Sequence, residues 1–531
     1  MASLTVVLLL VVLATAVATG ARHWRVPAPS LLVLAGLLAG LLPWVPDVRV
    51  APDVIAVVVL PPLLYASAEE LSARELRPVW RPVTVLALGL VLASAAAVAL
   101  VASVVTPLPP AMAFVLGAVL ASTDPVAVTA LGRRLSLPPR MQVIVQGESL
   151  FNDATSLVLF KVAVAGAVAA SAVSVPGAVG EFLLLGGGGA VIGGAVGALV
   201  TLIRRRTRDV TLETVIALVT PYAAYVVAED LHTSGVTAVV VAAVVLGSTG
   251  HRLTGPRVRI QLHAVYGTVV FLLESVVFAI IGLQLPLMVK ELAASEGSWP
   301  LWVLGCAGTV LAVRLLWIFP LSALTQYRRR GRAPAGQAGR MSWRVPAVLS
   351  WAGTRGVMPL AAALSIPLTT HAGLPLPYRP LVLVLTTGVV VVTLVVQGFT
   401  LSPVVRRSGV ALDPGHTARE EARIRRTLTA AALAELDQMV EVDAAPRAAA
   451  DQVRSGLRAR YERAAAAADD AAGGSGARDA HEDDVRALRR ALTAAETAEL
   501  HRMYEDGRVG GATMRRIQHT LDLERASLDE R

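Results

Sequence analysis

The chain has 531 residues, of which 55% are hydrophobic and only 16% charged, and its formal net charge is +9 at pH 7. Soluble domains contain about 25% charged residues, so this composition excludes an ordinary soluble enzyme and indicates a polytopic membrane protein. The basic residues lie mostly in short loops between apolar runs, which argues against a nucleic-acid-binding face. The single cysteine, Cys306, excludes an internal disulfide and a thiolate metal cluster, and we interpret it as a small core residue.

Apolar runs of the length that crosses a bilayer as a helix recur from the N-terminus to about Ser402. The first run resembles a signal peptide, but it has no basic n-region and no clear cleavage site, and we interpret it as the first span. Thirteen spans are predicted, at residues 3–20, 27–43, 53–68, 82–105, 111–131, 142–171, 178–203, 210–228, 234–249, 264–287, 300–326, 345–366 and 377–402.

The loops between these spans alternate in charge. Nearly all basic loop residues lie in the odd-numbered loops, whereas the even-numbered loops and the span edges beside them carry only Arg49, Lys290 and Arg379. Because basic residues accumulate in cytoplasmic loops, the odd loops are predicted to be cytoplasmic, with the N-terminus outside and the C-terminus inside. Adding or losing one span would reverse the pattern beyond it, so the alternation also supports the count of thirteen.

The composition changes after about residue 403, where the long apolar runs end. We therefore predict two domains, a transmembrane domain at 1–403 and a cytoplasmic, helix-rich tail at 404–531. The tail contains an internal repeat, since residues 424–439 match residues 488–503 at ten of sixteen positions. Two similar helical units of this kind are expected to pack on each other or on a second subunit, or to be a solvated tail without a specific role.

One predicted span carries a polar stripe. Glu148 and Asn152 are four residues apart, as are Ser149 and Asp153, so each pair shares a helix face. A carboxylate at membrane depth costs several kcal/mol, and such a residue is by default a candidate for function. Hard cations prefer carboxylate, amide and hydroxyl oxygens, so the stripe predicts a cation site.

Another carboxylate, Asp124, lies in the apolar run 111–131, between Thr123 and Pro125. Proline removes a backbone donor and frees a carbonyl at membrane depth, and broken helices in transporters supply such carbonyls to ion sites. If Asp124 and Asp153 lie close together, burial and mutual repulsion disfavour their charges. Protons are then expected to compete with cations for the pair.

Three basic residues, Lys161, Arg314 and Arg355, lie within predicted spans. Arg314 cannot easily lose its proton and needs a buried carboxylate, and Glu148 is the preferred partner. Arg355, between two glycines, is expected either to shape the site or to bond freed carbonyls. Lys161 is expected to snorkel to the interface or, as the second choice, to pair with an acid.

Several motifs together resemble one family, the NhaP-type bacterial sodium/proton antiporters, which are related to the animal sodium/proton exchangers. The resemblance covers about residues 1–410. Its most specific segments are Thr123-Asp124-Pro125 and 147–153 (GESLFND), with support from 60–65 (LPPLLY), 234–236 (SGV), 278–285 (FAIIGLQL) and 353–356 (GTRG).

The resemblance implies an all-α membrane fold with thirteen transmembrane helices, inverted repeats, two interrupted helices that cross, and a homodimer in the bacterial plasma membrane. It implies that Asp153 carries a cation or a proton in alternation, with Na⁺ bound also by Asp124, Ser149 and the main chain of Thr123. It implies an ion pair between Glu148 and Arg314. The transported Na⁺ or Li⁺ and H⁺ are substrates, and no cofactor is expected.

Two positions qualify this resemblance. Asn152 precedes Asp153 where electrogenic relatives have two aspartates, which resembles the electroneutral branch and implies exchange of one Na⁺ for one H⁺. Ala66 stands where some relatives have an acidic ligand, so affinity and ion preference are not carried over.

Three other functions share some of these sequence features. A K⁺/H⁺ antiporter of the same fold is compatible with the same ligand types. An intramembrane aspartyl protease also needs two buried aspartates, but its Gly-x-Gly-Asp signature is absent from the sequence, and Asn152 and Ser149 have no role in it. A channel fits less well, because carboxylates that compete for protons beside a buried ion pair favour a carrier over a continuous pore.

Overall fold

The computed structural model describes residues 28–42, 51–69, 73–124, 138–169, 175–207, 209–253, 256–293, 297–330, 342–370, 373–410, 414–441 and 447–473, with scattered single residues and short pieces elsewhere. The described residues are helical almost throughout, and the β-structure among them is one isolated bridge between Thr369 and Pro375. The chain divides into two compact units, Met1–Leu412 and Asp413–Arg531.

Helices occupy all the predicted spans from the second onward, while the first, residues 3–20, lies mostly outside the described residues. The helices of the first unit are α2 (Ala28–Gly40), α3 (Pro52–Val54), η1 (Ile55–Val59), α4 (Leu60–Glu69), α5 (Ala73–Leu76), α6 (Trp80–Thr84), η2 (Val85–Leu90), α7 (Val91–Val105), α8 (Pro110–Ala121), α10 (Pro139–Ala169), α11 (Val175–Arg204), α12 (Val210–Asp230), α13 (Gly235–Leu253), α14 (Pro256–Ala293), α15 (Trp299–Arg330), α16 (Arg344–Trp351), α17 (Val357–Leu364) and α18 (Arg379–Ser408). Within the described part of the chain, seven helical segments are long and apolar enough to cross a membrane, and four further apolar helices are shorter.

Prolines shape the span that contains α3, η1 and α4. Pro62 has no N–H, so the carbonyl of Val58 loses its usual partner four residues on. Val58 lies in the π-helix η1, which ends two residues before Pro61, and the hydroxyl of Tyr222 donates to the Val58 carbonyl at 3.3 Å. A neighbouring helix thus satisfies a backbone group that lipid cannot.

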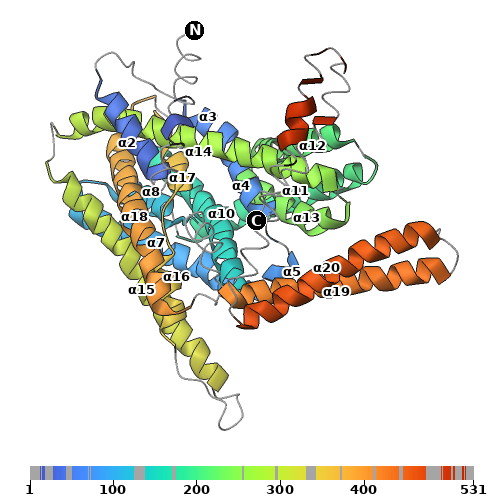
Figure 1. Ribbon diagram of the computed structural model, residues 1–531. Coiled ribbons are helices and arrows are strands. Elements are labelled where there is room, and N and C mark those ends of the chain that lie inside the picture. Colours follow the sequence, from blue (N-terminus) through green and yellow to red (C-terminus); the bar gives the residue numbers. More distant parts are fainter. Residues whose placement is uncertain are drawn as a thin grey trace. The chain divides into compact units, whose positions relative to one another are not determined.

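The helices of the first unit pack mainly as two bundles (Figure 1). The core bundle consists of α6–η2–α7, α8, α10, α15, α16, α17 and α18, and the scaffold bundle of α2, α4, α11, α12, α13 and α14. Close backbone approach holds the scaffold together. For example, a Cβ at Gly282 of α14 would lie 2.8 Å from the backbone nitrogen of Leu37 in α2, so only glycine fits there.

The second unit contains a helical hairpin of α19 (Pro414–Glu441) and α20 (Arg447–Gly473), seen as two long antiparallel helices in Figure 1. Arg454 of α20 donates to Asp437 of α19 at 2.9 Å, and the guanidinium of Arg426 lies over the ring of Tyr461. The predicted repeat at 424–439 lies within α19. In its partner at 488–503, residues 494–500 are helical, whereas residues 488–491 lie outside the described residues. The first unit continues to Leu412, past the predicted boundary at 403, because α18 runs on to Ser408.

Candidate ion-binding site

The helix α8 stops in the middle of an apolar segment. Its last residue is Ala121, and Ser122 is already extended, with φ −64° and ψ 144°. The residue before a proline is disfavoured in the α region, so Pro125 opposes a helical Asp124. Residues 122–124 therefore run as a short extended segment, and the remainder of the predicted span 111–131 lies outside the described residues.

A second break separates α16 from α17, so the predicted span 345–366 is an interrupted helix. Residues 353–356 between the two short helices are not helical. The backbone N–H of Asp124 donates to the carbonyl of Thr354 at 2.8 Å, and the Thr354 hydroxyl donates to the carbonyl of Asp124 at 3.0 Å. The segments 122–124 and 353–356 thus meet and satisfy each other's freed backbone groups.

Arg355 satisfies two further carbonyls at this meeting point. Its Nε donates to the carbonyl of Leu120 in the last turn of α8 at 2.8 Å, and its Nη1 donates to the carbonyl of Gly353 at 3.0 Å. The side chain is 1% exposed. A buried cation beside the C-terminal ends of α8 and α16 opposes the negative ends of both helix dipoles. Of the two roles expected for Arg355, the structure shows bonds to freed carbonyls.

The polar stripe of α10 faces the extended segment 122–124. Ser149 donates to the carbonyl of Thr123, Ser122 donates to Oδ1 of Asp153, and Nδ2 of Asn152 donates to the hydroxyl of Thr123 at 3.1 Å. All are buried, and Asp153 is 5% exposed. In the described part of the chain, the Oδ1 atom of Asn152 is buried without a hydrogen-bond partner.

Glu148 points away from this segment toward α15. Arg314 donates to both of its carboxylate oxygens, at 2.5 and 3.1 Å, and also to the carbonyl of Leu349 at 3.0 and 3.2 Å. Both residues are at most 2% exposed. Gly353 provides the space for the guanidinium, because a Cβ there would lie 2.8 Å from Cζ of Arg314. The structure thus brings together the two residues that the sequence paired.

Three carboxylates remain near the meeting point of the two segments. Asp153 lies close enough to Asp124 and Arg355 to interact electrostatically with each, and Asp124 interacts in the same way with Glu274 of α14. Carboxylate, hydroxyl and main-chain oxygens converge here in a buried setting, which is the ligand chemistry of a hard cation. Carboxylates of this kind also accept protons.

Sequence reasoning did not single out Ser122 or Thr354, which hold Asp153 and Asp124. The signal for Ser122 was its place in the polar run before Pro125, and Thr354 lies in the glycine-flanked segment that was assigned only to Arg355. Serine and threonine in a transmembrane segment commonly bond their own helix, so residue type alone does not predict these contacts with other segments. Ala66, the departure noted in the sequence, lies half-buried in α4.

Buried charges gathered where one helix ends inside an apolar run and another is interrupted are typical of one class, the multi-pass secondary transporters. The chain belongs to the family described as sodium/hydrogen exchanger, transmembrane, which it matches over residues 7–407. This confirms the resemblance to NhaP-type antiporters and makes the protein a transporter of monovalent cations and protons.

Relatives support this membership. A Mycobacterium tuberculosis protein named as an uncharacterized Na⁺/H⁺ exchanger is 35% identical over 529 residues, covering 98% of this chain and 96% of that protein. The Na⁺/H⁺ antiporter ApNhaP of Aphanothece halophytica is 30% identical over 73% of this chain and 71% of its own length. The Bacillus subtilis sodium, potassium, lithium and rubidium/H⁺ antiporter is 30% identical over 71% of this chain and 57% of its own length.

The fold is similar to a solved structure. The sodium proton antiporter MjNhaP1 from Methanocaldococcus jannaschii, at pH 8, superposes with a TM-score of 0.62, covering 77% of this chain and 98% of that chain at 19% identity. At this identity the likeness concerns the fold alone. It agrees with the all-helical antiporter architecture expected from the sequence.

Proposed function

We propose that the protein exchanges one Na⁺ or Li⁺ for one H⁺ across the bacterial plasma membrane by alternating access. The observation that carries this proposal is the position of Asp153. Its carboxylate is buried beside Asp124, at the point where α10 contacts the extended segment that ends α8. Two carboxylates so placed bind a cation when ionised and release it when one takes a proton.

Each predicted site residue has a place in this scheme. Asp153 and Asp124 supply charged ligands, while the Ser149 hydroxyl and the Thr123 carbonyl, bonded to each other here, supply neutral oxygens. Asn152 holds the extended segment through Thr123. Glu148 stays ionised against Arg314 as a structural pair, and Arg355 shapes the site through the helix ends. The Na⁺ and H⁺ are cargo, and the scheme uses no cofactor.

Electroneutral exchange follows from Asn152. An amide at this position leaves Asp153 as the ionisable residue of the Asn152–Asp153 pair, so the net charge of the site is the same with one cation bound as with one proton bound. Exchange driven by a pH gradient in proteoliposomes is then expected to be unchanged when a K⁺ ionophore clamps the membrane potential at zero. A strong dependence on potential would contradict the 1:1 stoichiometry.

A second candidate is K⁺/H⁺ exchange through the same site. It is favoured by one relative, the Bacillus subtilis protein, whose name includes both sodium and potassium. Oxygen ligands alone do not separate the two ions. Cation-dependent proton flux measured with Na⁺, Li⁺ and K⁺ separately decides between them, and Na⁺ and Li⁺ are expected to drive flux at lower concentrations than K⁺.

The proposed membrane arrangement has thirteen spans with inverted repeats, the N-terminus outside, the tail in the cytoplasm and a homodimer in the bilayer. The charge alternation of the loops supports this topology. The end of α8 at Ala121, inside the predicted span 111–131, and the break between α16 and α17 support this arrangement, because two repeats are expected to carry matching interruptions.

The substitution that tests the site is Asp153→Asn. It removes the exchangeable charge and keeps the size of the side chain, so coupled exchange is expected to be lost while the protein still purifies as a folded transporter. Ser156→Ala is a suitable control. Ser156 lies on the same helix and also bonds α8, but its hydroxyl donates to the carbonyl of Ala118, at 2.7 Å, and not to the segment 122–124. Unchanged transport by Asp153→Asn would overturn the assignment.

A further inference from the structure

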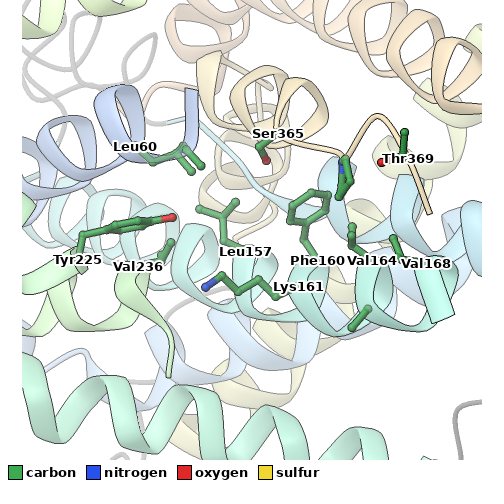
Figure 2. Close-up of a pocket in the computed structure, with 13 residues that line it drawn as sticks. Leu60, Leu157, Phe160, Lys161, Val164, Val168, Tyr225, Val236, Ser365 and Thr369 are labelled. Carbon is green, nitrogen blue, oxygen red and sulfur yellow. The ribbon is translucent and has the colours of Figure 1, made fainter. Parts of the chain in front are cut away.

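A cavity of about 370 Å³ lies beside α10, on the C-terminal side of Asp153. Figure 2 shows its lining, in which Leu157, Phe160 and Val164 of α10 face Leu60, Tyr225 and Val236. Leu157 is one helical turn from Asp153, so the cavity begins directly next to the candidate site. Most of the lining is apolar, and its charged member is Lys161.

Every element that forms the cavity does so at the same end of the molecule. They are the start of η1, the C-terminal half of α10, the end of α12, the start of α13, and the segment 365–369 that follows α17. Each of these adjoins an even-numbered loop, and the charge alternation of the sequence places the even-numbered loops outside. The cavity therefore lies on the outer side of Asp153.

Lys161, which lines the cavity, forms an ion pair with Glu229. Pairing with an acid, the second of the two roles expected for Lys161, is thus the one found. Lys161 belongs to α10 of the core bundle and Glu229 to α12 of the scaffold bundle, so the ion pair joins the two bundles. Figure 2 shows the Lys161 side chain extended toward Tyr225 and Val236, which are on the scaffold side.

The carboxylate of Glu229 is also bonded within the scaffold bundle. Its Oε1 atom accepts the backbone N–H of Gly235, the first residue of α13, at 2.9 Å. A Cβ at Gly235 would lie 2.8 Å from the same oxygen, so glycine is required for this approach. The scaffold bundle therefore fixes the carboxylate at the positive end of a helix, and Lys161 is the partner that moves with the core.

We propose that this cavity is the outer access route to Asp153 and that the Lys161–Glu229 pair is the latch that closes it. The proposal rests on the alternating-access function given above, in which one bundle rocks against the other. In the arrangement seen here the latch is shut. When the core bundle moves to expose Asp153 to the outside, Lys161 leaves Glu229 and the cavity widens into an open path.

The test measures access from outside with a cysteine reporter. Ala165 lines the cavity, and Ala165→Cys in a Cys306→Ala background gives one thiol for a membrane-impermeant maleimide. Lys161→Met and Glu229→Gln are each expected to raise the labelling rate in intact cells by a factor of about two to five, the range that a part-exposed ion pair contributes to an equilibrium. The charge swap, Lys161→Glu with Glu229→Lys, is expected to return the rate toward its starting value.

A matched control is the ion pair of Arg204 and Glu213, 3.9 Å apart, which joins α11 to α12 within the scaffold bundle. Glu213→Gln breaks an ion pair without separating the bundles and is expected to leave the labelling rate unchanged. The latch is overturned if neither single substitution changes the rate, if the swap is as fast as either single substitution, if Glu213→Gln has the same effect, or if the reporter reacts only from the cytoplasmic face of inverted vesicles.

Transport is scored separately, as Na⁺-dependent proton flux in proteoliposomes. If the unsubstituted protein shows no such flux, the antiport proposal fails whatever the labelling rates are. If flux is normal and the labelling rates do not respond to either single substitution, only the latch fails.

Discussion

The carboxylate of Asp124 lies against the main chain of Gly356, in the place that a side chain on residue 356 would occupy. A Cβ there would lie 2.6 Å from the Cβ of Asp124 and would overlap its carboxylate. Gly356 directly precedes the first residue of α17, so the carboxylate lies at the positive end of a helix dipole. The backbone of Gly356 is not in the left-handed region, with φ −122°, and glycine is required here for space alone.

Gly356→Ala is therefore expected to displace Asp124 and to lower the rate of cation-dependent proton flux by a factor on the order of 10–100, because misplacing a reacting group by about 1 Å has effects of that size. Gly305→Ala in α15 is the control, since a Cβ at that glycine meets nothing within 4 Å. Flux in proteoliposomes and the melting temperature in detergent are measured for both. Equal flux in the two variants would show that the contact does not matter.

The buried pair of Glu148 and Arg314 predicts an asymmetry in stability. Glu148→Gln leaves an uncompensated guanidinium in the membrane and is expected to cost about 3–5 kcal/mol, whereas replacing both partners by neutral residues of similar size is much milder. Melting temperatures of Glu148→Gln, Arg314→Met and the double variant are the measurement. If the double variant melts no higher than the lower of the two single variants, the pair does not act as a unit.

The arrangement of the site residues was predictable where they lie on one helix. The 3.6-residue period alone places Glu148 with Asn152 and Ser149 with Asp153, and the cost of a buried guanidinium directs Arg314 to a deep carboxylate. The partners Ser122 and Thr354 were not predictable, because they bond across segments about thirty and two hundred residues apart in sequence, and helical periodicity carries no information on such contacts.

The spans were predictable because hydropathy over about 20 residues reports on bilayer thickness. For the same reason, the ends of the helices were not. The helix α14 begins at Pro256 and ends at Ala293, several residues beyond each edge of the predicted span 264–287, since a helix continues into water wherever no residue stops it. The π-helix η2 (Val85–Leu90) within the span 82–105 was not predictable either, because hydropathy does not distinguish a π-helix from an α-helix.

Substitutions of two serines in α10 can distinguish a role in ion binding from a role in helix packing. Ser149 donates to the carbonyl of Thr123 at the site, and Ser156, two turns on, donates to the carbonyl of Ala118. Both substitutions to alanine remove one buried hydrogen bond, worth about 1 kcal/mol. Ser149→Ala is expected to raise the KM for Na⁺ several-fold, whereas Ser156→Ala is expected to lower the melting temperature similarly without changing KM. The same change in KM for both would remove Ser149 from the ligand set.

Substitutions of Arg355 and Arg379 allow a similar comparison for the arginines that bond carbonyl groups at helix ends. Each uses its guanidinium to bond two carbonyls. Arg355 bonds Leu120 and Gly353 beside the site, while Arg379 bonds Ile366 at 2.9 Å and Leu364 at 3.2 Å at the far end of α17. Lysine keeps the charge but cannot reproduce the fork of two donors.

Arg355→Lys is therefore expected to loosen the contact between α8 and the segment 353–356, which lies between α16 and α17. Because that contact positions Asp124 and Asp153 together, the variant should lose both stability and flux, with a raised KM for Na⁺. Arg379→Lys breaks the same kind of fork far from either aspartate and should lower the melting temperature with KM unchanged. Flux titrated with Na⁺ and thermal unfolding of both variants decide the matter. A KM that moves equally in both, or in neither, would assign Arg355 to packing alone.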